Sequence, residues 1–324
     1  MTVLVAGGAG FIGSHLCESL LNQSYKVVCV DNLITGNKNN LNKFLKNPDF
    51  IFIAQNISES LSNLIPHLAA GQITSIDYVF HLASPASPNK KSPRSYISFP
   101  IETLLVNSVG THNLLELAKH FNSKFLYASS SEIYGDPALS PQSENYFGNV
   151  NPNGVRSVYD DGKRFGEAIT MAYVRKYNLD ARIIRIFNTY GPVMQKDDGR
   201  VVSNFIAQAI VSQPITVYGR GTQTRSFCYV DDMVSGIKAA MFASKTKGGV
   251  FNLGNPDEKT ILGLANFIKQ MTNSSSEIVF EELPQDDPKS RKPDISHAKN
   301  ILGWEPKINI EQGLERTITY FKKL

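Results

Sequence analysis

Cysteine and tryptophan are scarce in this sequence, whose 324 residues include three cysteines and one tryptophan. The cysteines are odd in number and have no metal-ligand spacing: they are Cys17, Cys29 and Cys228. This pattern excludes a disulfide framework and a cysteine-based metal site. We therefore expect reduced, mostly buried thiols, a cytoplasmic protein and no bound metal.

The sequence also lacks a strong excess of one charge and any long hydrophobic run. Its formal net charge is +4 and its basic residues are dispersed, so we expect neither a nucleic-acid partner nor a membrane partner. No apolar stretch is long enough to cross a bilayer, and Met1 leads directly into the first predicted strand, which argues against a signal peptide. The length suffices for a nucleotide-binding domain and a smaller second lobe.

A glycine-rich segment near the N-terminus carries a binding motif. Between a predicted strand, Thr2–Ala6, and a predicted helix, Phe11–Leu21, the chain reads Gly7-Gly8-Ala9-Gly10-Phe11-Ile12-Gly13. These glycines permit a tight turn, a close approach of backbone to a pyrophosphate, and close packing of helix on strand. Asp31 follows the next apolar run, where a carboxylate can accept a hydrogen bond from a ribose 2′-hydroxyl. The segment predicts a dinucleotide site that prefers NAD, since a 2′-phosphate would meet like charge.

Strand and helix patterns alternate through the first half of the chain. The predicted strands are Thr2–Ala6, Lys26–Val30, Phe50–Ile53, Tyr78–Leu82, Lys124–Ser129 and Ala181–Phe187. Longer helices are expected from about Ile101 to His120 and from Tyr159 to Tyr177. The alternation predicts an α/β fold, a doubly wound parallel Rossmann sheet with a smaller C-terminal α/β substrate lobe. The expected cofactor domain is 1–187 plus 226–254, and the expected substrate lobe is 188–225 plus 255–324.

A tyrosine and a lysine supply the candidate chemistry. Tyr159 and Lys163 lie one helical turn apart and share a face. A free tyrosine titrates at about pH 10, too high for a general base at neutral pH, but a neighbouring ammonium and a positive nicotinamide ring both favour the phenolate. Ser130 or Ser131, at the end of the preceding strand, can hydrogen-bond the same substrate oxygen. With the dinucleotide motif, the pair predicts redox chemistry at a hydroxyl-bearing carbon.

Further motifs extend over nearly the whole chain. They are GGAGFIGSHL from Gly7, HLASPASP from His81, SSSEIYGDP from Ser129, YDDGKR from Tyr159, RIFNTYGP from Arg185, DGRVVSNFI from Asp198, VYGRGTQTRSFCYVDD from Val217, NLGNP from Asn252, DDPKSRKPDI from Asp286 and LGWEP from Leu302. In these motifs the chain resembles the extended short-chain dehydrogenases/reductases of the NAD-dependent epimerase/dehydratase family, and more closely the UDP-glucuronate decarboxylases (UDP-xylose synthases). The Ser131-Glu132 pair and Arg291-Lys292-Pro293 are the parts closest to that subgroup.

The resemblance implies NAD-dependent decarboxylation of UDP-glucuronate to UDP-xylose. Tyr159 would take the proton of the C4 hydroxyl as hydride passes to NAD⁺, and the 4-ketone would let the C5 carboxylate leave as carbon dioxide before the hydride returns. Lys163 would lower the pKa of Tyr159 and hold the nicotinamide ribose, while Ser130 would orient the C4 oxygen. Ser131 and Glu132 would lie near C5. Sugar 4,6-dehydratases carry an aspartate at the place of Ser131, so dehydration is disfavoured.

The resemblance also implies two sets of binding residues. Those expected at the cofactor, besides Tyr159 and Lys163, are Gly7, Gly10, Phe11, Ile12, Gly13, Asp31, Asn32, Thr35, Gly36, Asn56, Ile57, Leu82, Ser84, Thr189 and Arg200. Those expected at the substrate are Ser84, Asn113, Tyr173, Asn188, Asn204, Tyr218, Arg225 and Arg291. The two arginines are the expected diphosphate ligands, because guanidinium binds phosphate oxygens bidentately.

The segment after Pro88 departs from the family pattern. Asn89–Phe99 is several residues longer than in similar sequences and carries Lys90, Lys91 and Arg94, while Leu105 stands where the decarboxylases often have a lysine. Either an inserted basic residue replaces that lysine at the carboxylate, or the preferred sugar differs, or the insertion is a surface loop without effect. Asn56 replaces an expected aspartate near adenine and can still accept a hydrogen bond.

Other functions remain open at this point. A nucleotide-sugar epimerase, 4,6-dehydratase or 4-dehydrogenase would use the same Tyr159–Lys163 couple, and a non-catalytic protein that binds NAD or a sugar nucleotide would need only the fold. The resemblance further implies a homodimer. In it the helices Ile101–His120 and Tyr159–Tyr177 would pack against their copies as a four-helix bundle.

Overall fold

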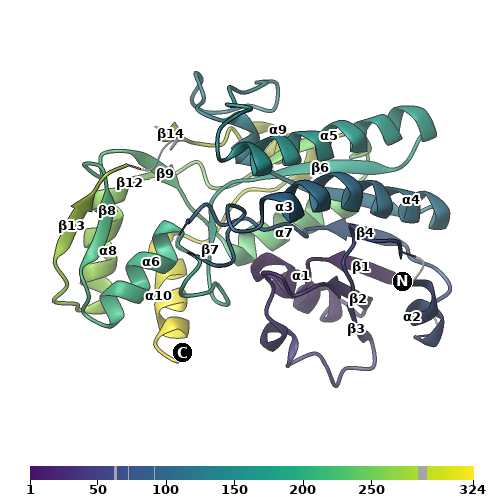
Figure 1. Cartoon of the computed structure of the whole chain (residues 1–324), viewed down its shortest axis with the longest axis horizontal. Helices are drawn as coiled ribbons and strands as arrows, with labels where there is room; N and C mark the ends of the chain where they lie inside the picture. Colours follow the sequence, from purple (N-terminus) through teal and green to yellow (C-terminus); the bar gives the residue numbers. More distant parts are fainter. Residues whose placement is uncertain (62–63, 72, 91, 284–289) are drawn as a thin grey trace.

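The larger part of the molecule is built on one parallel sheet with the strand order β3-β2-β1-β4-β5-β6-β11 (Figure 1). The computed structural model describes residues 1–324 except 62–63, 72, 91 and 284–289. The strands of the sheet are β1 (Thr2–Ala6), β2 (Lys26–Asp31), β3 (Phe50–Ala54), β4 (Tyr78–His81), β5 (Lys124–Ser130), β6 (Ala181–Ile186) and β11 (Val250–Leu253). The chain reverses direction across the sheet between β1 and β4, which is where ligands bind in sheets of this kind.

Helices cover both faces of the sheet because its strands are apolar on both sides. Val3 and Val5 belong to the core shared with α1 (Phe11–Leu21) and α7 (Val230–Phe242). Leu4 and its neighbours on that face belong to a second core. That core is shared with α2 (Leu64–Ala70), α4 (Thr111–Phe121) and α5 (Ser157–Tyr177). The predicted doubly wound α/β fold is confirmed.

The expected helix from Ile101 to His120 is interrupted. It consists of α3 (Pro100–Leu105), a π-helical turn (Val106–Gly110) and α4. In the turn, the Asn107 side chain donates to Ser84 Oγ at 2.9 Å and accepts from the Tyr127 hydroxyl at 2.9 Å. These bonds tie the helix to the end of the sheet, which local apolar periodicity does not reveal.

A smaller body is formed mainly by later segments of the chain and lies to the left in Figure 1. It contains the parallel pair β8 (Ile215–Tyr218) and β13 (Ile278–Glu281) and the sheet β12-β9-β14 (Glu258–Thr260, Thr224–Ser226 and Ser290–Arg291). Its helices are α6 (Val201–Ile210), α8 (Ile261–Thr272) and α10 (Ile310–Phe321). The short pair β7 (Thr189–Tyr190) and β10 (Cys228–Tyr229) and helix α9 (Ser296–Leu302) complete the fold, with short helical turns at Lys38–Leu41 and Ser131–Tyr134.

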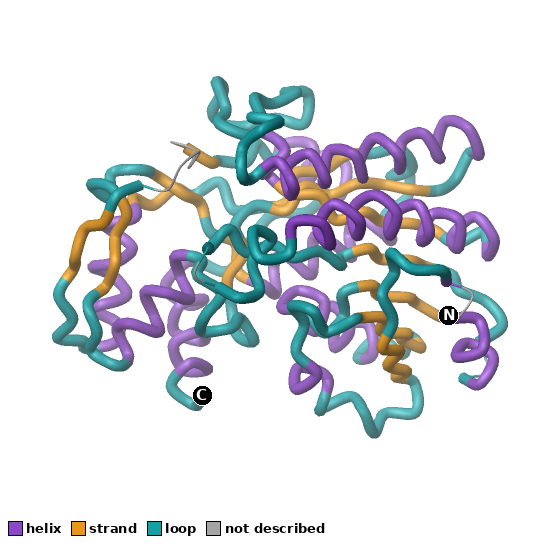
Figure 2. Tube along the Cα trace, viewed as in Figure 1, coloured by secondary structure: helices purple, strands orange, loops and turns teal. Residues whose placement is uncertain are grey.

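The carboxyl ends of the central strands bring distant segments to one edge. β1 ends at Ala6, β2 at Asp31, β4 at His81 and β5 at Ser130. Figure 2 shows loops gathered between this edge and the smaller body. Within the described part of the chain, no helix combines the length and apolar character of a membrane span, and no group of three metal-ligating side chains occurs.

Candidate active site

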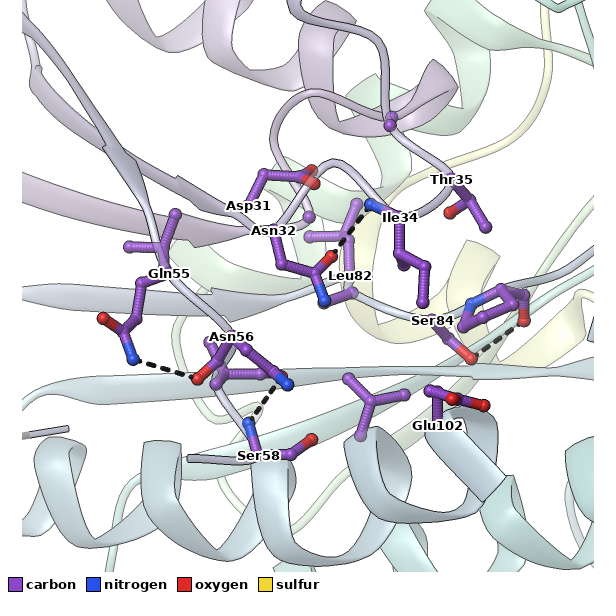
Figure 3. A pocket seen from close by; sticks show the side chains of 18 of the residues that line it. Asp31, Asn32, Ile34, Thr35, Gln55, Asn56, Ser58, Leu82, Ser84 and Glu102 are labelled. Atoms are coloured by element: carbon purple, nitrogen blue, oxygen red, sulfur yellow. Dashed lines mark hydrogen bonds between the residues drawn. The ribbon is translucent and has the colours of Figure 1, made fainter. Parts of the chain in front are cut away.

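A cavity of about 700 Å³ lies over the carboxyl ends of β1, β2 and β4 (Figure 3). It brings together ten of the residues predicted at the cofactor, which are Gly7, Gly10, Asp31, Asn32, Thr35, Gly36, Asn56, Ile57, Leu82 and Ser84. Phe11, Ile12 and Gly13 form the first turn of α1 beside it. The elements of the glycine motif therefore meet at one place in three dimensions.

The glycine turn fits a dinucleotide. A Cβ at Gly13 would lie 2.1 Å from the Gly7 carbonyl oxygen, so α1 packs on the turn only with glycine there. A Cβ at Gly10 would meet only the Gly7 carbonyl oxygen, at 3.2 Å, and would otherwise extend into open space. Gly10 caps α1 without a side-chain hydrogen bond, and the free amides of a helix N-terminus attract phosphate.

Asp31 is fixed at the edge of this cavity. Its carboxylate accepts hydrogen bonds from the backbone N–H of Ala9 at 3.0 Å and of Leu33 at 2.8 Å. Burial raises the pKa of Asp31, although both backbone bonds act to lower it. Nearby, Asn56 accepts from the Ser58 N–H at 3.0 Å. The oriented carboxylate is suited to accept from a ribose hydroxyl.

Tyr159 and Lys163 occupy the first turns of α5, against the end of β5. The Lys163 ammonium donates to the Ala128 carbonyl oxygen at 2.8 Å and lies 5.7 Å from the centre of the Tyr159 ring. Both side chains are buried. The predicted couple is thus assembled on one helix and held against the catalytic strand.

Burial dominates the pKa values of the couple. It raises the pKa of Tyr159 to about 12, while a hydrogen bond with Ser130 lowers it. Burial also lowers the pKa of Lys163 to about 7, with the charge of Glu167 opposing. That Lys163 and a positive nicotinamide ring together favour the phenolate stays a prediction.

Glu132 lies between two arginines. Its carboxylate accepts from Arg156 on one oxygen and from Arg291 on the other. Burial acts to raise the pKa of Glu132, but the two guanidinium groups outweigh it and hold it at about 2. Ser130 accepts from the Glu132 N–H at 3.2 Å, and Ser131 is buried at the start of the same turn. Arg291 therefore lies beside Glu132, not only at a diphosphate site as predicted.

A second, open cavity of about 1870 Å³ extends from Glu132 into the smaller body. It brings together eight predicted residues, namely Glu132, Asn188, Thr189, Arg200, Asn204, Tyr218, Arg225 and Arg291. Arg200 is paired with Asp198 at 2.5 Å and interacts electrostatically with Tyr159, so this cavity adjoins the catalytic couple.

Two predicted substrate residues lie elsewhere. Asn113 donates to the Ile57 and Glu59 carbonyl oxygens at 2.8 Å and 2.9 Å, and the Tyr173 hydroxyl donates to Glu116 at 2.5 Å. Neither lines either cavity, so their place beside the sugar stays a prediction. Asn113 is thus bound to the segment that follows β3, and Tyr173 is bound to α4.

The inserted segment is part of the site. Lys90 and Tyr96 line the larger cavity, whereas Arg94 is held outside it by Gln195 at 2.5 Å; Lys91 lies outside the described residues. Leu105 lines the smaller cavity instead. Sequence reasoning missed Tyr96, Arg156 and Asp160 because no motif spacing connects them to Glu132.

The fold and the glycine turn define a class: enzymes that bind a dinucleotide at the carboxyl edge of a parallel sheet. The model described as "NAD dependent epimerase/dehydratase family" matches residues 3–254. The chain is 49% identical to UDP-glucuronic acid decarboxylase 3 of Arabidopsis thaliana over 97% of this chain and 87% of that protein. The chain belongs to the NAD-dependent epimerase/dehydratase family, and it is similar in sequence to that family's UDP-glucuronic acid decarboxylases.

Solved structures of related enzymes have the same fold. UDP-glucose 4-epimerase of Thermotoga maritima, determined with UDP-glucose, has a TM-score of 0.88 and 30% identity, covering 100% of this chain and 99% of that one. UDP-glucuronic acid 4-epimerase of Bacillus cereus, determined with UDP-glucuronic acid and NAD, has a TM-score of 0.86 and 31% identity over the same shares. The fold of this chain is thus shared with enzymes that were solved with nucleotide sugars.

Proposed function

We propose that this protein is an NAD-dependent decarboxylase that converts UDP-glucuronate to UDP-xylose. The observation that carries the proposal is Glu132, held ionised by two arginines beside Ser130 and Tyr159, in a chain 49% identical to a UDP-glucuronic acid decarboxylase. Serine at position 131 supports it, because a serine hydroxyl is a poor acid for expelling a hydroxyl group. A 4,6-dehydratase reaction is therefore disfavoured.

Each step has a residue suited to it. Tyr159 takes the proton from the C4 hydroxyl, and Ser130, hydrogen-bonded to Tyr159, holds the same oxygen. The residues of the smaller cavity would hold NAD⁺, which would supply the acceptor for the C4 hydride and the donor for its return. The 4-ketone makes the C5 carboxylate a β-keto acid, which loses carbon dioxide because the ketone accepts the electron pair.

The remaining residues bind and orient. Lys163 and Asp31 support the cofactor, with the smaller cavity's residues around its adenosine half. Arg225 lines the larger cavity and is the guanidinium suited to the diphosphate, with Tyr218 near the base and Asn188 and Asn204 along the substrate. We extend this to the domains: residues 1–187 plus 226–254 bind cofactor, and 188–225 plus 255–324 bind the sugar nucleotide.

Proton NMR with UDP-glucuronate and catalytic NAD⁺ tests the proposal. UDP-xylose formed over many turnovers per cofactor supports decarboxylation with internal return of the hydride. A second function, 4-epimerisation, is favoured by the similarity to the Bacillus cereus UDP-glucuronic acid 4-epimerase. It would produce UDP-galacturonate with the carboxylate retained, and that product would refute decarboxylation.

We also propose a cytoplasmic homodimer. Apolar side chains stay exposed along α3, the π-helical turn and α5, at Ile101, Leu104, Leu105, Val109 and Phe165. Since α3 and α4 each pack on α5, these side chains can meet their copies as a four-helix bundle. A sedimentation mass of one chain would contradict the dimer, and Ile101→Glu with Phe165→Glu should convert a dimer to that mass.

A further inference from the structure

Decarboxylation requires a proton that Tyr159 cannot supply. This inference rests on the proposed function. When the bond from C5 to the carboxylate breaks, its electron pair becomes an enolate with C4, and C5 must then gain a proton. The proton that Tyr159 takes from the C4 hydroxyl returns to the C4 oxygen when the ketone is reduced. A second donor is therefore needed at C5.

Glu132 cannot be that donor. Both of its oxygens accept hydrogen bonds from guanidinium groups, Arg156 on one side and Arg291 on the other. Those charges hold it ionised despite its burial. Ser131 is no acid. The donor must be another buried group on the same side of the site.

Two buried polar atoms at this place have no hydrogen-bond partner among the described residues. They are the Tyr96 hydroxyl and Asp160 Oδ1, on side chains that are 1% and 5% exposed. A buried polar atom without a partner costs free energy and indicates a ligand or a proton-transfer role. The two groups interact electrostatically with each other, and both interact with Glu132 and Arg156.

Tyr96 reaches the substrate side. Its ring lies parallel to the Tyr159 ring, with centroids 5.0 Å apart and an interplanar angle of 10°, and it lines the larger cavity. Its position is fixed by the loop: the Tyr96 N–H donates to the Ser87 carbonyl oxygen at 3.1 Å, and the Ser87 hydroxyl donates to the Asp198 carbonyl oxygen at 2.5 Å. The inserted segment is thus anchored, not a free surface loop.

Asp160 lies behind this position, on the turn of α5 that carries Tyr159. The groups facing it are Glu132 from the turn after β5, Arg156 before α5, Arg291 from β14, Tyr96 from the loop and Asp161 from its own helix. Burial first, and then the charge of Glu132, raise the pKa of Asp160 to about 8, against the two arginines. Its surroundings therefore favour the protonated form of Asp160.

We propose that Asp160 and Tyr96 form a proton relay that protonates C5 of the enolate after carbon dioxide leaves. The Tyr96 O–H bond breaks as its proton joins C5. The π electrons of the enolate carbon–carbon double bond form the C5–H bond, and a lone pair of the C4 oxygen re-forms the ketone. No hydrogen bond joins these two described side chains, so a bridging water passes the proton of the Asp160 carboxyl to Tyr96, and Asp160 becomes a carboxylate. Solvent then reprotonates Asp160, which supplies the one proton that each turnover consumes.

The test follows the C5 hydrogens of UDP-xylose in heavy water, with enzyme and NAD⁺. Reversible oxidation at C4 makes those hydrogens acidic, and the relay run backwards exchanges one of them for deuterium. NMR measures the exchange, and the absorbance of the reduced nicotinamide separately measures oxidation at C4. Wild-type enzyme should lose one of the two C5 signals.

Asp160→Asn and Tyr96→Phe should each slow the exchange by about 100-fold, the usual contribution of a general acid or base, and should slow C4 oxidation far less. Asp161→Asn is the matched control, since Asp161 lies next on the helix and pairs with Arg164 at 4.0 Å; it should alter neither rate. Exchange at the wild-type rate in either relay variant overturns the proposal. So does a parallel loss of exchange and C4 oxidation, which marks a structural role.

The relay and the proposed decarboxylation can be tested independently of each other. Formation of UDP-xylose from UDP-glucuronate by the wild-type enzyme tests decarboxylation without any variant. If the wild-type protein decarboxylates and the relay variants exchange normally, only the relay is refuted.

Discussion

Arg185 on β6 and Glu167 on α5 form an ion pair with two parallel hydrogen bonds, Nε to Oε1 at 2.9 Å and Nη2 to Oε2 at 2.8 Å. The Arg185 guanidinium also donates to the Tyr134 hydroxyl and to the Glu144 carbonyl oxygen, both at 2.9 Å. Both paired side chains are largely buried. Glu167 lies one turn after Lys163, so the pair fixes the catalytic helix against the sheet.

Breaking this pair should destabilise the fold strongly. Arg185→Met leaves the Glu167 carboxylate without its partner in a buried place, and we expect the free energy of unfolding to fall by about 3–5 kcal/mol. Urea unfolding followed by circular dichroism measures it. The matched control is Lys43→Met, which breaks an exposed pair with Glu18 and should cost at most about 1 kcal/mol. Equal losses in the two variants would contradict this role.

The Glu132 ion pairs should stabilise the protein in a defined pH range. The folded pKa, about 2, lies below the ordinary value of 4.5, so the stabilisation is complete above pH 4.5 and disappears as the pH falls toward 2. Glu132→Gln should lower the free energy of unfolding by about 3 kcal/mol near neutral pH. The difference in unfolding free energy between Glu132→Gln and wild type should become smaller as the pH falls below 4.5.

The contribution of Asp160 to stability should depend on pH in the opposite direction. Its folded pKa, about 8, lies above the ordinary 3.8, so its contribution is present below pH 3.8 and is lost as the pH rises toward 8. Unfolding free energies of wild type, Glu132→Gln and Asp160→Asn across this range test both statements. If the unfolding free energies of Glu132→Gln and wild type differ by the same amount at every pH, the statement about Glu132 is refuted.

Asp31 should determine the choice of cofactor. Asp31→Ser removes the carboxylate that Ala9 and Leu33 hold at the cavity edge. Losing a charged hydrogen bond of about 1.5–3 kcal/mol should weaken NAD binding about 10- to 100-fold, and binding of NADP should weaken less or improve. Fluorescence titration measures both, with Asp49→Ser as an exposed control. An unchanged ratio of the two affinities would show that Asp31 does not discriminate between them.

The strands and the glycine motif could be predicted because their information is local. β1 and β3 carry uninterrupted apolar runs, and the spacing of Gly7, Gly10 and Gly13 requires a turn between strand and helix. The π-helical turn could not be predicted, since Asn107 is ordered by bonds to Ser84 and Tyr127 from other elements. Tertiary contacts, and not the local sequence, determine the backbone conformation of that turn.

The electrostatics of the site could not be predicted from the sequence. Arg156 and Arg291 lie 24 and 159 residues from Glu132 in the sequence. The spacing of these residues does not indicate that they come into contact. The pKa of Tyr159 depends on burial, which only packing determines. The same holds for Asn113 and Tyr173, whose residue types suit a sugar site but whose side chains contact other groups.

Lys90 is the inserted cation placed to meet an anionic substrate, because it lines the larger cavity near Tyr96 and Glu132. If Lys90 attracts the uronate carboxylate, Lys90→Gln should raise the KM for UDP-glucuronate about 5-fold at low salt, as expected for a partly solvated charge pair, and leave kcat nearly unchanged. The inhibition constant of UDP-xylose, which has no carboxylate, should not change. Lys46→Gln, an exposed lysine outside both cavities, is the control. Equal weakening of both nucleotide sugars would instead place Lys90 at the diphosphate.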